Sequence, residues 1–378
     1  MKRNDVRSII ARRFASARMA LGLSQEDVAA KMGFKDRQIV SNIESEKRSV
    51  SAEELILAGQ IFNKPYMYFM DPYILDEKIS WRTDGQNVDI TEFKKKAENI
   101  LASYVRFADL LGKTANPIEY CLQVNKKTSY EAVSSMADTL VNEWRLGNIP
   151  AENLYQNVKD NLKIEILNLD CPEKVSGGAC RIDNYRIIFI SINEPYYRRN
   201  FNLAHELFHI LTWNQLEPRE LDFYNELEDD NIKHKPREEQ LADRFASALL
   251  MPTGILTKLW ENRNKSNITE WLNTTAETLR VAAIALYWRL YNMGCSVELA
   301  TVNKGELSCY GKDKSMIHEP DQSKMLSDTF LENINDVLEK GLVSIKKMSD
   351  LLDMPEDDIL DMIQKHGKQS SYERQRQA

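Results

Sequence analysis

Ala204-His205-Glu206-Leu207-Phe208-His209-Ile210-Leu211 is an HExxH sequence, in which two histidines stand four residues apart. Residues at this spacing share one face of an α-helix, so His205 and His209 can direct two imidazoles at a single metal ion. Glu206 follows the first histidine, where a carboxylate can accept a proton from metal-bound water. The apolar residues around the motif predict that the other sides of this helix are buried. The alternative is a core helix with polar residues at its rim.

Residues 237–252 supply the expected third ligand of such a site. The pattern HExxHxxGxxH is excluded, because Thr212 and Gln215 stand where Gly and His are required. Apolar residues at helical spacing predict an amphipathic helix within residues 237–252. On another face of it, Glu239 is the expected ligand that leaves a fourth position open for water. Asp243, one turn further on, is expected to accept a hydrogen bond from a ligand histidine. The alternative is that both acids are solvated.

The residues around these two motifs carry a family resemblance. Phe201 to Leu211, followed by Glu239-x-x-Ala242-Asp243-x-Phe245-Ala246-x-x-Leu249-Leu250-Met251-Pro252, resembles the ImmA/IrrE family of metallo-endopeptidases over about residues 130–295. The chain departs from that family at Phe208, where Gly is usual, and at Asp243, where Asn is usual. Residues 177–193 also look like the family, and their Gly-marked start, Asp-Asn turn and β-branched run predict a hairpin. The resemblance implies a zincin-like fold with a small β-sheet, a Zn²⁺ cofactor and an Xre-type repressor protein as substrate or partner.

The N-terminal part is predicted to consist of five short helices. Gly22 and Gly33 separate runs of apolar residues at helical spacing, and Ser24, Asp36 and Ser51 are suitable N-caps. A tight turn between the second and third helices is typical of a helix-turn-helix arrangement.

This region is similar to a known DNA-binding family. Leu23 to Gly33, with Asn42-Ile43-Glu44 and Lys47-Arg48, resembles the Xre/phage-repressor family, in which the third helix enters the major groove. The resemblance implies a double-stranded DNA operator as partner, contacted by Gln25, Arg37, Gln38, Ser41, Asn42, Lys47 and Arg48. Amide and guanidinium groups suit base edges, and Arg18 is expected near phosphates with the last two of these residues. The chain departs from the family in a longer turn before the third helix and in Glu46, where Gly is usual. The alternative is a helical module that has lost DNA binding.

Outside these regions, the spacing of apolar residues predicts one long helix and a group of C-terminal helices. Residues 71–87 have neither a helical nor a strand period and are predicted to be a connector. Residues 93–111 carry an apolar stripe with lysines opposite. This helix either packs on the peptidase body or forms the seam of a homodimer, which paired DNA half-sites favour. Residues 325–366 are predicted to form small helices, followed by a disordered polar tail.

Two shorter segments have open interpretations. The acidic segment 217–235 is either a mobile lid over a cleft or a solvated loop. Within it, His234 either polarises a substrate carbonyl or is a plain surface histidine. Residues 300–312 are predicted to be a short strand or an extended tail.

Together these elements predict a mainly α chain of the α+β class with four parts. They are a five-helix Xre-type domain at 1–73, a linker and long bridging helix at 74–125, a zincin-like peptidase domain at 126–296, and a C-terminal helical subdomain with a polar tail at 297–378.

Composition and charge limit the function classes. The chain has 378 residues, 43% of them hydrophobic, and a net charge of −7, which fits a globular protein of two or three domains. Residues 1–48 hold eleven Lys and Arg against six Asp and Glu, which predicts a basic module that meets phosphate on an acidic body. No apolar run is long enough to span a membrane, and no secretory signal is visible. Five cysteines without CxxC spacing predict reduced thiols and a cytoplasmic protein.

The leading hypothesis is a DNA-binding transcription regulator with a zinc-dependent endopeptidase domain. Zinc held by His205, His209 and Glu239 would activate water, and Glu206 would pass the water's proton to the leaving amine. The resemblance implies cleavage of an Xre-type repressor, or of the protein itself, to derepress stress, phage or mobile-element genes. The rival hypothesis is a transcription regulator or antitoxin-like protein whose peptidase fold is a non-catalytic sensor or scaffold.

Overall fold

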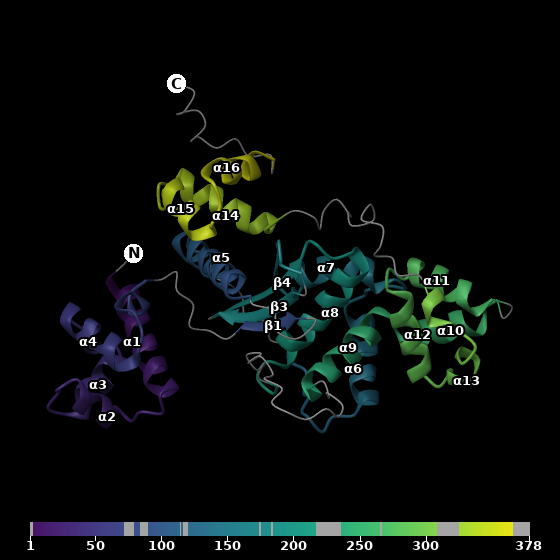
Figure 1. Cartoon of the computed structure of the whole chain (residues 1–378), viewed down its shortest axis with the longest axis horizontal. Coiled ribbons are helices and arrows are strands. Elements are labelled where there is room, and N and C mark those ends of the chain that lie inside the picture. Colours follow the sequence, from purple (N-terminus) through teal and green to yellow (C-terminus); the bar gives the residue numbers. More distant parts are fainter. Residues whose placement is uncertain are drawn as a thin grey trace. The chain divides into compact units, whose positions relative to one another are not determined.

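The chain is mainly helical with one four-stranded sheet, which confirms the predicted class (Figure 1). The computed structural model describes residues 3–71, 79–83, 90–113, 115, 120–173, 175–182, 184–216, 236–264, 267–307 and 325–365. The chain divides into two compact units, which are Met1–Asp76 with Lys94–Lys113 and Phe330–Ala378, and Glu77–Phe93 with Thr114–Thr329.

The N-terminal domain has the five predicted helices. They are α1 (Arg3–Ala20), α2 (Gln25–Lys31), α3 (Arg37–Glu44), α4 (Ala52–Phe62) and the 3₁₀ helix η1 (Tyr66–Phe69). The predicted N-caps are confirmed: the side chains of Ser24, Asp36 and Ser51 accept hydrogen bonds from backbone N–H groups in the first turns of α2, α3 and α4. Each cap satisfies an N–H group that has no partner within its own helix, and so defines where that helix begins.

The core of this domain is built on three phenylalanines from three helices. The ring of Phe14 meets that of Phe62 edge-on at 5.2 Å between centroids and lies 6.2 Å from that of Phe69. Beside them, the buried guanidinium of Arg13 donates to the carbonyls of Tyr68 at 2.5 Å and Asp71 at 2.6 Å. These bonds connect α1 to the last residues of the domain. They also replace the water that a charged guanidinium loses when it is buried.

The long helix α5 (Thr91–Leu110) forms as predicted, and its apolar stripe is buried within the chain. Tyr104 and Phe107 contact the ring of Phe330 in α14 (Asp328–Glu339) at 5.3 and 6.0 Å between centroids. At the end of α5, Lys113 donates to Asn333 at 2.6 Å. The stripe therefore packs on the C-terminal helices and is no exposed dimer seam. Those helices continue with α15 (Ile345–Leu352) and α16 (Glu356–Lys365).

The sheet has the strand order β1-β3-β4-β2 and mixes both directions. Its strands are β1 (Ile79–Thr83), β2 (Glu165–Leu169), β3 (Val175–Ile182) and β4 (Tyr185–Ser191). The predicted hairpin is confirmed, since β3 and β4 are antiparallel with Ile182 opposite Tyr185. Gly177 is required there, because a Cβ atom would lie 2.7 Å from the carbonyl oxygen of Phe189. The prediction that residues 71–87 contain no strand is wrong, because β1 pairs antiparallel with β3.

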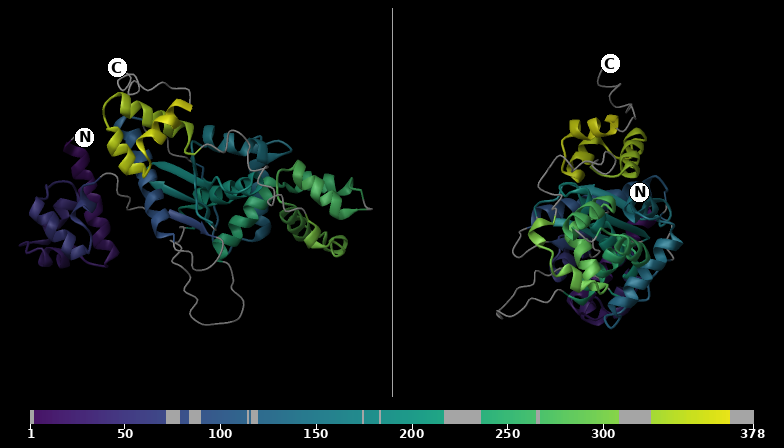
Figure 2. Two further views of the ribbon diagram at one scale, coloured as in Figure 1. Left: turned by 45° about the horizontal axis from the view of Figure 1, so that its top comes forward. Right: turned by 90° about the vertical axis from the view of Figure 1, so that its right-hand side faces the viewer.

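The helices of the second unit place the HExxH helix in its core. They are α6 (Tyr130–Glu143), α7 (Pro150–Asp160), α8 (Tyr196–Thr212), α9 (Arg237–Leu250), α10 (Thr253–Glu261), α11 (Ile268–Thr278), α12 (Ala283–Asn292), α13 (Ser296–Leu299) and the 3₁₀ helix η2 (Lys304–Glu306). Helix α8 contacts β3 and β4 on one side and α9 on another, and it runs beside the strands in Figure 1 and in the left-hand view of Figure 2.

Several expectations lie outside the described residues. These are the lid at 217–235 with His234, the end of the segment 300–312, Cys309 and the tail after residue 365. The described part of that segment, residues 300–307, contains the 3₁₀ helix η2 and no strand, so the prediction of a short strand there is wrong. The four cysteines that are described are free thiols, and burial raises the pKa of Cys171 to about 12, which keeps it protonated and unreactive. Among the described helices, none is long and apolar enough to cross a membrane.

Replacement of Phe14 by Ala is expected to lower the free energy of unfolding of the N-terminal domain by about 3–5 kcal/mol, since it leaves a cavity among the three rings. Hydrogen–deuterium exchange of peptides from residues 3–71 measures this loss. Met19→Ala is the control, because Met19 in the same helix is 61% exposed. Equal protection in the two variants would contradict the proposed role of the aromatic core.

Candidate functional site

Helix α8 presents both histidines of the HExxH motif on one buried face. His205 is 0% exposed and His209 is 2% exposed. The apolar positions of α8, among them Leu203 and Leu207, belong to the same hydrophobic core as Ile188 of β4. This packing fixes the helix against the sheet, so the direction of the two imidazoles is set by the core and not by a loop.

Helix α9 brings a carboxylate to the two imidazoles. The Oε2 atom of Glu239 lies 3.1 Å from Nε2 of His205, and its Oε1 atom lies 3.1 Å from Nε2 of His209. The two Nε2 atoms are 3.2 Å apart. The three residues thus form a cluster that can hold a metal ion.

The geometry of this cluster suits a zinc ion. A carboxylate oxygen and an unprotonated imidazole nitrogen are all acceptors, and such atoms repel one another at about 3 Å unless a proton or a cation lies among them. In a tetrahedron with bonds of about 2.0–2.1 Å, ligand atoms stand about 3.3 Å apart. The observed separations of 3.1–3.2 Å are close to that value, although each imidazole faces a different oxygen of Glu239.

Neighbouring groups affect the protonation of the cluster. The Oδ1 atom of Asp243 lies 2.9 Å from Nδ1 of His205. Because a carboxylate only accepts, this contact places the ring hydrogen on Nδ1 and leaves the Nε2 lone pair for the cluster. Burial acts to raise the pKa of Glu239, but hydrogen bonds and positive charge from His205 and His209, when their Nε2 atoms carry hydrogen, outweigh burial and hold this pKa well below its usual range.

Glu206 follows His205 on α8 and is 1% exposed. Its carboxylate is not part of the three-residue cluster. His234, which the sequence also suggested as a candidate, lies outside the described residues.

Phe208 stands where the ImmA/IrrE pattern usually has Gly, and the structure accommodates it in the core. Its ring is fully buried and lies 5.4 Å from that of Phe245 in α9. This contact joins the two helices that carry the cluster.

The expected DNA-facing residues lie around α3 in the N-terminal domain. Arg37, Gln38 and Lys47 are exposed, whereas Ser41 and Asn42 are partly buried. The side-chain amide of Gln38 donates to Oδ1 of Asn42 at 3.1 Å. Polar groups of the exposed residues are accessible to solvent.

Three other residues expected near DNA, Arg18, Gln25 and Arg48, form hydrogen bonds within the N-terminal domain. Glu44 accepts hydrogen bonds from the guanidinium of Arg18 at 2.7 Å and from the amide of Gln25 at 2.7 Å. Arg48 forms a two-bond ion pair with Glu54 at 2.6 and 3.0 Å. Glu44 was not among the expected residues, because no local pattern connects it with residues 19 and 26 positions earlier in the chain.

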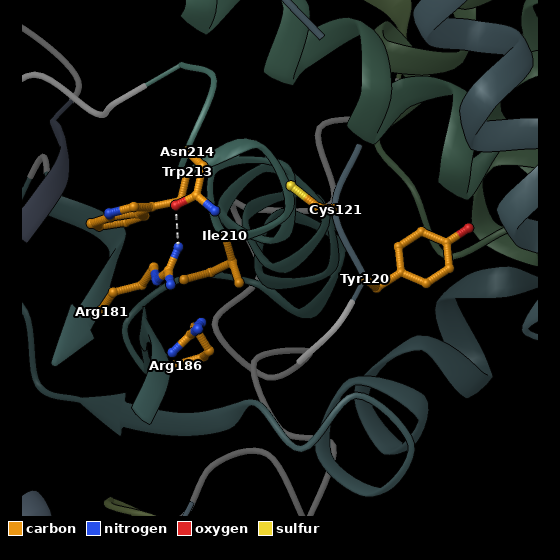
Figure 3. Close-up of a pocket in the computed structure, with 7 residues that line it drawn as sticks. All are labelled: Tyr120, Cys121, Arg181, Arg186, Ile210, Trp213 and Asn214. Carbon is orange, nitrogen blue, oxygen red and sulfur yellow. Dashed lines mark hydrogen bonds between the residues drawn. The ribbon is translucent and has the colours of Figure 1, made fainter. Parts of the chain in front are cut away.

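A separate small cavity lies at the C-terminal end of α8 (Figure 3). It is lined by Tyr120, Cys121, Arg181, Arg186, Ile210, Trp213 and Asn214. Arg181 donates to Asn214 there at 2.7 Å. Its volume of about 40 Å³ suffices for a few water molecules at most, so it is no substrate pocket.

Asp243→Ala removes the acceptor that orients His205, so we expect zinc binding to weaken by about 10- to 100-fold. Competition with a chelator measures this change. Ser247→Ala, one turn further along α9, serves as the control. If both variants held zinc equally well, Asp243 would have no part in orienting the ligand.

Two family descriptions match parts of the chain. The IrrE N-terminal-like domain of the M78 peptidases matches residues 159–291, and a helix-turn-helix description matches residues 14–69. The first range contains all three residues of the metal-binding cluster. The second contains α2, α3 and α4.

Other comparisons add little. Comparison with curated proteins finds no match. Among solved structures, Bacillus thuringiensis PlcR in complex with the peptide PapR7 and DNA is 12% identical over 95% of this chain and 97% of that chain, with a TM-score of 0.18, too low to support an argument. The two domain matches and the buried cluster agree, so this chain combines an Xre-type helix-turn-helix domain, which implies DNA binding, with an IrrE N-terminal-like domain of the M78 peptidases.

Proposed function

We propose that the chain is a DNA-binding regulator whose second domain is a zinc-dependent endopeptidase. The observation that carries the proposal is the meeting of His205, His209 and Glu239 with Asp243 behind the first imidazole. Two neutral imidazoles and one carboxylate are a common ligand set of catalytic zinc and leave a coordination position open. A bound zinc ion would supply Lewis-acid activation of water and of the scissile carbonyl.

The remaining chemistry belongs to residues of the chain. Glu206 is the proposed general base that accepts a proton from the attacking water and returns it to the leaving amine. Its burial at 1% exposure suits this task, because removal from water strengthens the interaction of a carboxylate with nearby charge. Asp243 keeps His205 in the tautomer that directs its Nε2 atom into the cluster.

The proposed substrate is an Xre-type repressor, either a separate protein or a second copy of this chain. The IrrE-like domain and the chain's own helix-turn-helix domain support this choice. Cleavage would release repression of stress, phage or mobile-element genes. On the DNA side, the proposed contact residues are Gln25, Arg37, Gln38, Ser41, Asn42, Lys47 and Arg48.

Glu206→Gln should keep stoichiometric zinc and lower the rate of cleavage by about 10²–10⁴-fold, because the amide cannot accept the proton. Metal analysis and mass spectrometry of the products, with Xre-type repressors and the chain itself as substrates, measure both quantities. Glu261→Gln, an exposed change on α10, is the matched control. Cleavage at the unaltered rate by Glu206→Gln would remove Glu206 from this role. Zinc without cleavage in the unaltered protein would favour a regulator with a non-catalytic peptidase fold.

Glu46→Gly should strengthen binding to duplex DNA and stabilise the N-terminal domain by about 1 kcal/mol. Glu46 has φ of 63°, a left-handed conformation that glycine adopts without strain, and its charge repels phosphate. Glu46→Gln separates the two effects, since it removes the charge and keeps the strain. Titrations of a non-specific duplex at several salt concentrations, with thermal unfolding, measure both. Unchanged DNA affinity in both variants would place residue 46 away from the DNA.

A further inference from the structure

The first turn of α9, which carries Glu239, begins without a side-chain cap. Its N-cap is Pro236, whose side chain forms no capping hydrogen bond. A side-chain cap normally stabilises the first turn of a helix. Glu239 is the third residue of α9, so fraying of this turn would move the carboxylate that faces the two imidazoles. Other contacts must therefore hold the turn.

Those contacts come from the Lys126–Tyr130 segment, the residues that lead into α6. Arg237 donates to the carbonyl of Thr128 at 2.7 Å and to that of Lys126 at 3.4 Å. Its guanidinium also stacks on the ring of Tyr130, 4.0 Å from the centroid. A positive charge at the N-terminus of a helix is unfavourable because of the helix dipole. The two carbonyls and the ring of Tyr130 compensate for this effect at Arg237.

The neighbours of Glu239 on both sides are held by the same segment. Glu238 is 8% exposed and lies 3.5 Å from the ammonium of Lys126. Gln240 accepts a hydrogen bond from the hydroxyl of Tyr130. One further contact to Tyr130 comes from Arg244, whose guanidinium lies 5.7 Å from the ring centroid.

Helical spacing explains why these contacts act on Glu239. Arg237, Gln240 and Arg244 are three and four residues apart and lie on one face of α9. Glu239 and Asp243, also four apart, form the adjacent face that meets His205. The Lys126–Tyr130 segment thus restrains both the rotation and the fraying of the turn while leaving the ligand face clear.

We propose that the Lys126–Tyr130 segment, chiefly through Tyr130 and Arg237, positions Glu239 as the third metal ligand. This inference rests on the proposed metal centre. Tyr130 and Arg237 are positioning residues and are not members of the cluster. The ligands of a metal ion must be held close to one geometry. Glu239 is the one residue of the cluster that α8 does not supply, and the segment lowers the free-energy cost of ordering it.

The test measures the zinc dissociation constant of the full chain by chelator competition. Tyr130→Ala should weaken zinc binding about tenfold, the lower end of the range for groups that orient a ligand. Tyr130→Phe keeps the ring under Arg237 and should restore most of that loss. Tyr120→Ala and Tyr120→Phe are the matched controls, because the ring of Tyr120 also packs on a neighbouring side chain, meeting that of Trp144 edge-on, and its hydroxyl donates to Glu143. Neither control should change zinc affinity.

A double-mutant cycle shows whether Tyr130 acts through Glu239. In a Glu239→Ala background, Tyr130→Ala should change zinc affinity by less than about twofold, since the ligand that it positions is gone. Hydrogen–deuterium exchange in residues 236–243 of the zinc-free protein should increase in Tyr130→Ala and stay unchanged in the Tyr120 variants.

The outcomes separate the two proposals. Zinc in the unaltered protein with no loss of affinity in Tyr130→Ala overturns the positioning role and leaves the metal centre standing. An equal loss in the Glu239→Ala background also overturns it, because the effect would then be general destabilisation. Failure of the unaltered protein to bind zinc overturns the metal centre and this inference together.

Discussion

The second domain is organised around one electrostatic constraint: two imidazole nitrogens and both oxygens of one carboxylate meet at distances of 3.1–3.2 Å. Acceptor atoms at this distance repel one another unless a proton or a cation lies among them. The apolar packing of α8 buries both imidazoles, whereas the Glu239 side chain on α9 keeps 21% of its surface exposed. A divalent cation bound there, as proposed, would contribute to the free energy of folding as well as to catalysis.

The contacts behind the cluster decide how well it is organised. Asp243 sets the tautomer of His205, the rings of Phe208 and Phe245 join the two helices, and Tyr130 with Arg237 holds the start of α9. Each contact connects residues distant in sequence, and each acts on a different degree of freedom: protonation, the separation of the helices, and the order of the first turn. Together these contacts restrict the cluster to one geometry. A metal site ordered in this way can polarise a substrate without first rearranging its ligands.

The N-terminal domain uses its charges in a comparable way. Glu44 and Glu54 hold Arg18, Gln25 and Arg48 on the domain surface, while the start of α3 keeps exposed polar side chains. An arginine that is already in an ion pair loses less rotamer freedom when it binds a phosphate. Part of its charge, however, is already neutralised by its carboxylate partner. The strongest electrostatic contribution to DNA binding is thus expected from exposed residues such as Arg37 and Lys47.

The sequence by itself determined the helices, their caps, the β3–β4 hairpin and the choice of Glu239, because these depend on period, on capping chemistry and on a motif whose spacing matches the helical turn. Tertiary structure alone decided that residues 79–83 form an edge strand and that α5 packs on α14. It also decided that Glu44 joins two helices and that the Lys126–Tyr130 segment holds α9. These contacts join residues whose separation along the chain follows no period. A five-residue strand acquires its pairing only from the backbone beside it, and an ion pair forms only where the completed fold brings its two ends together.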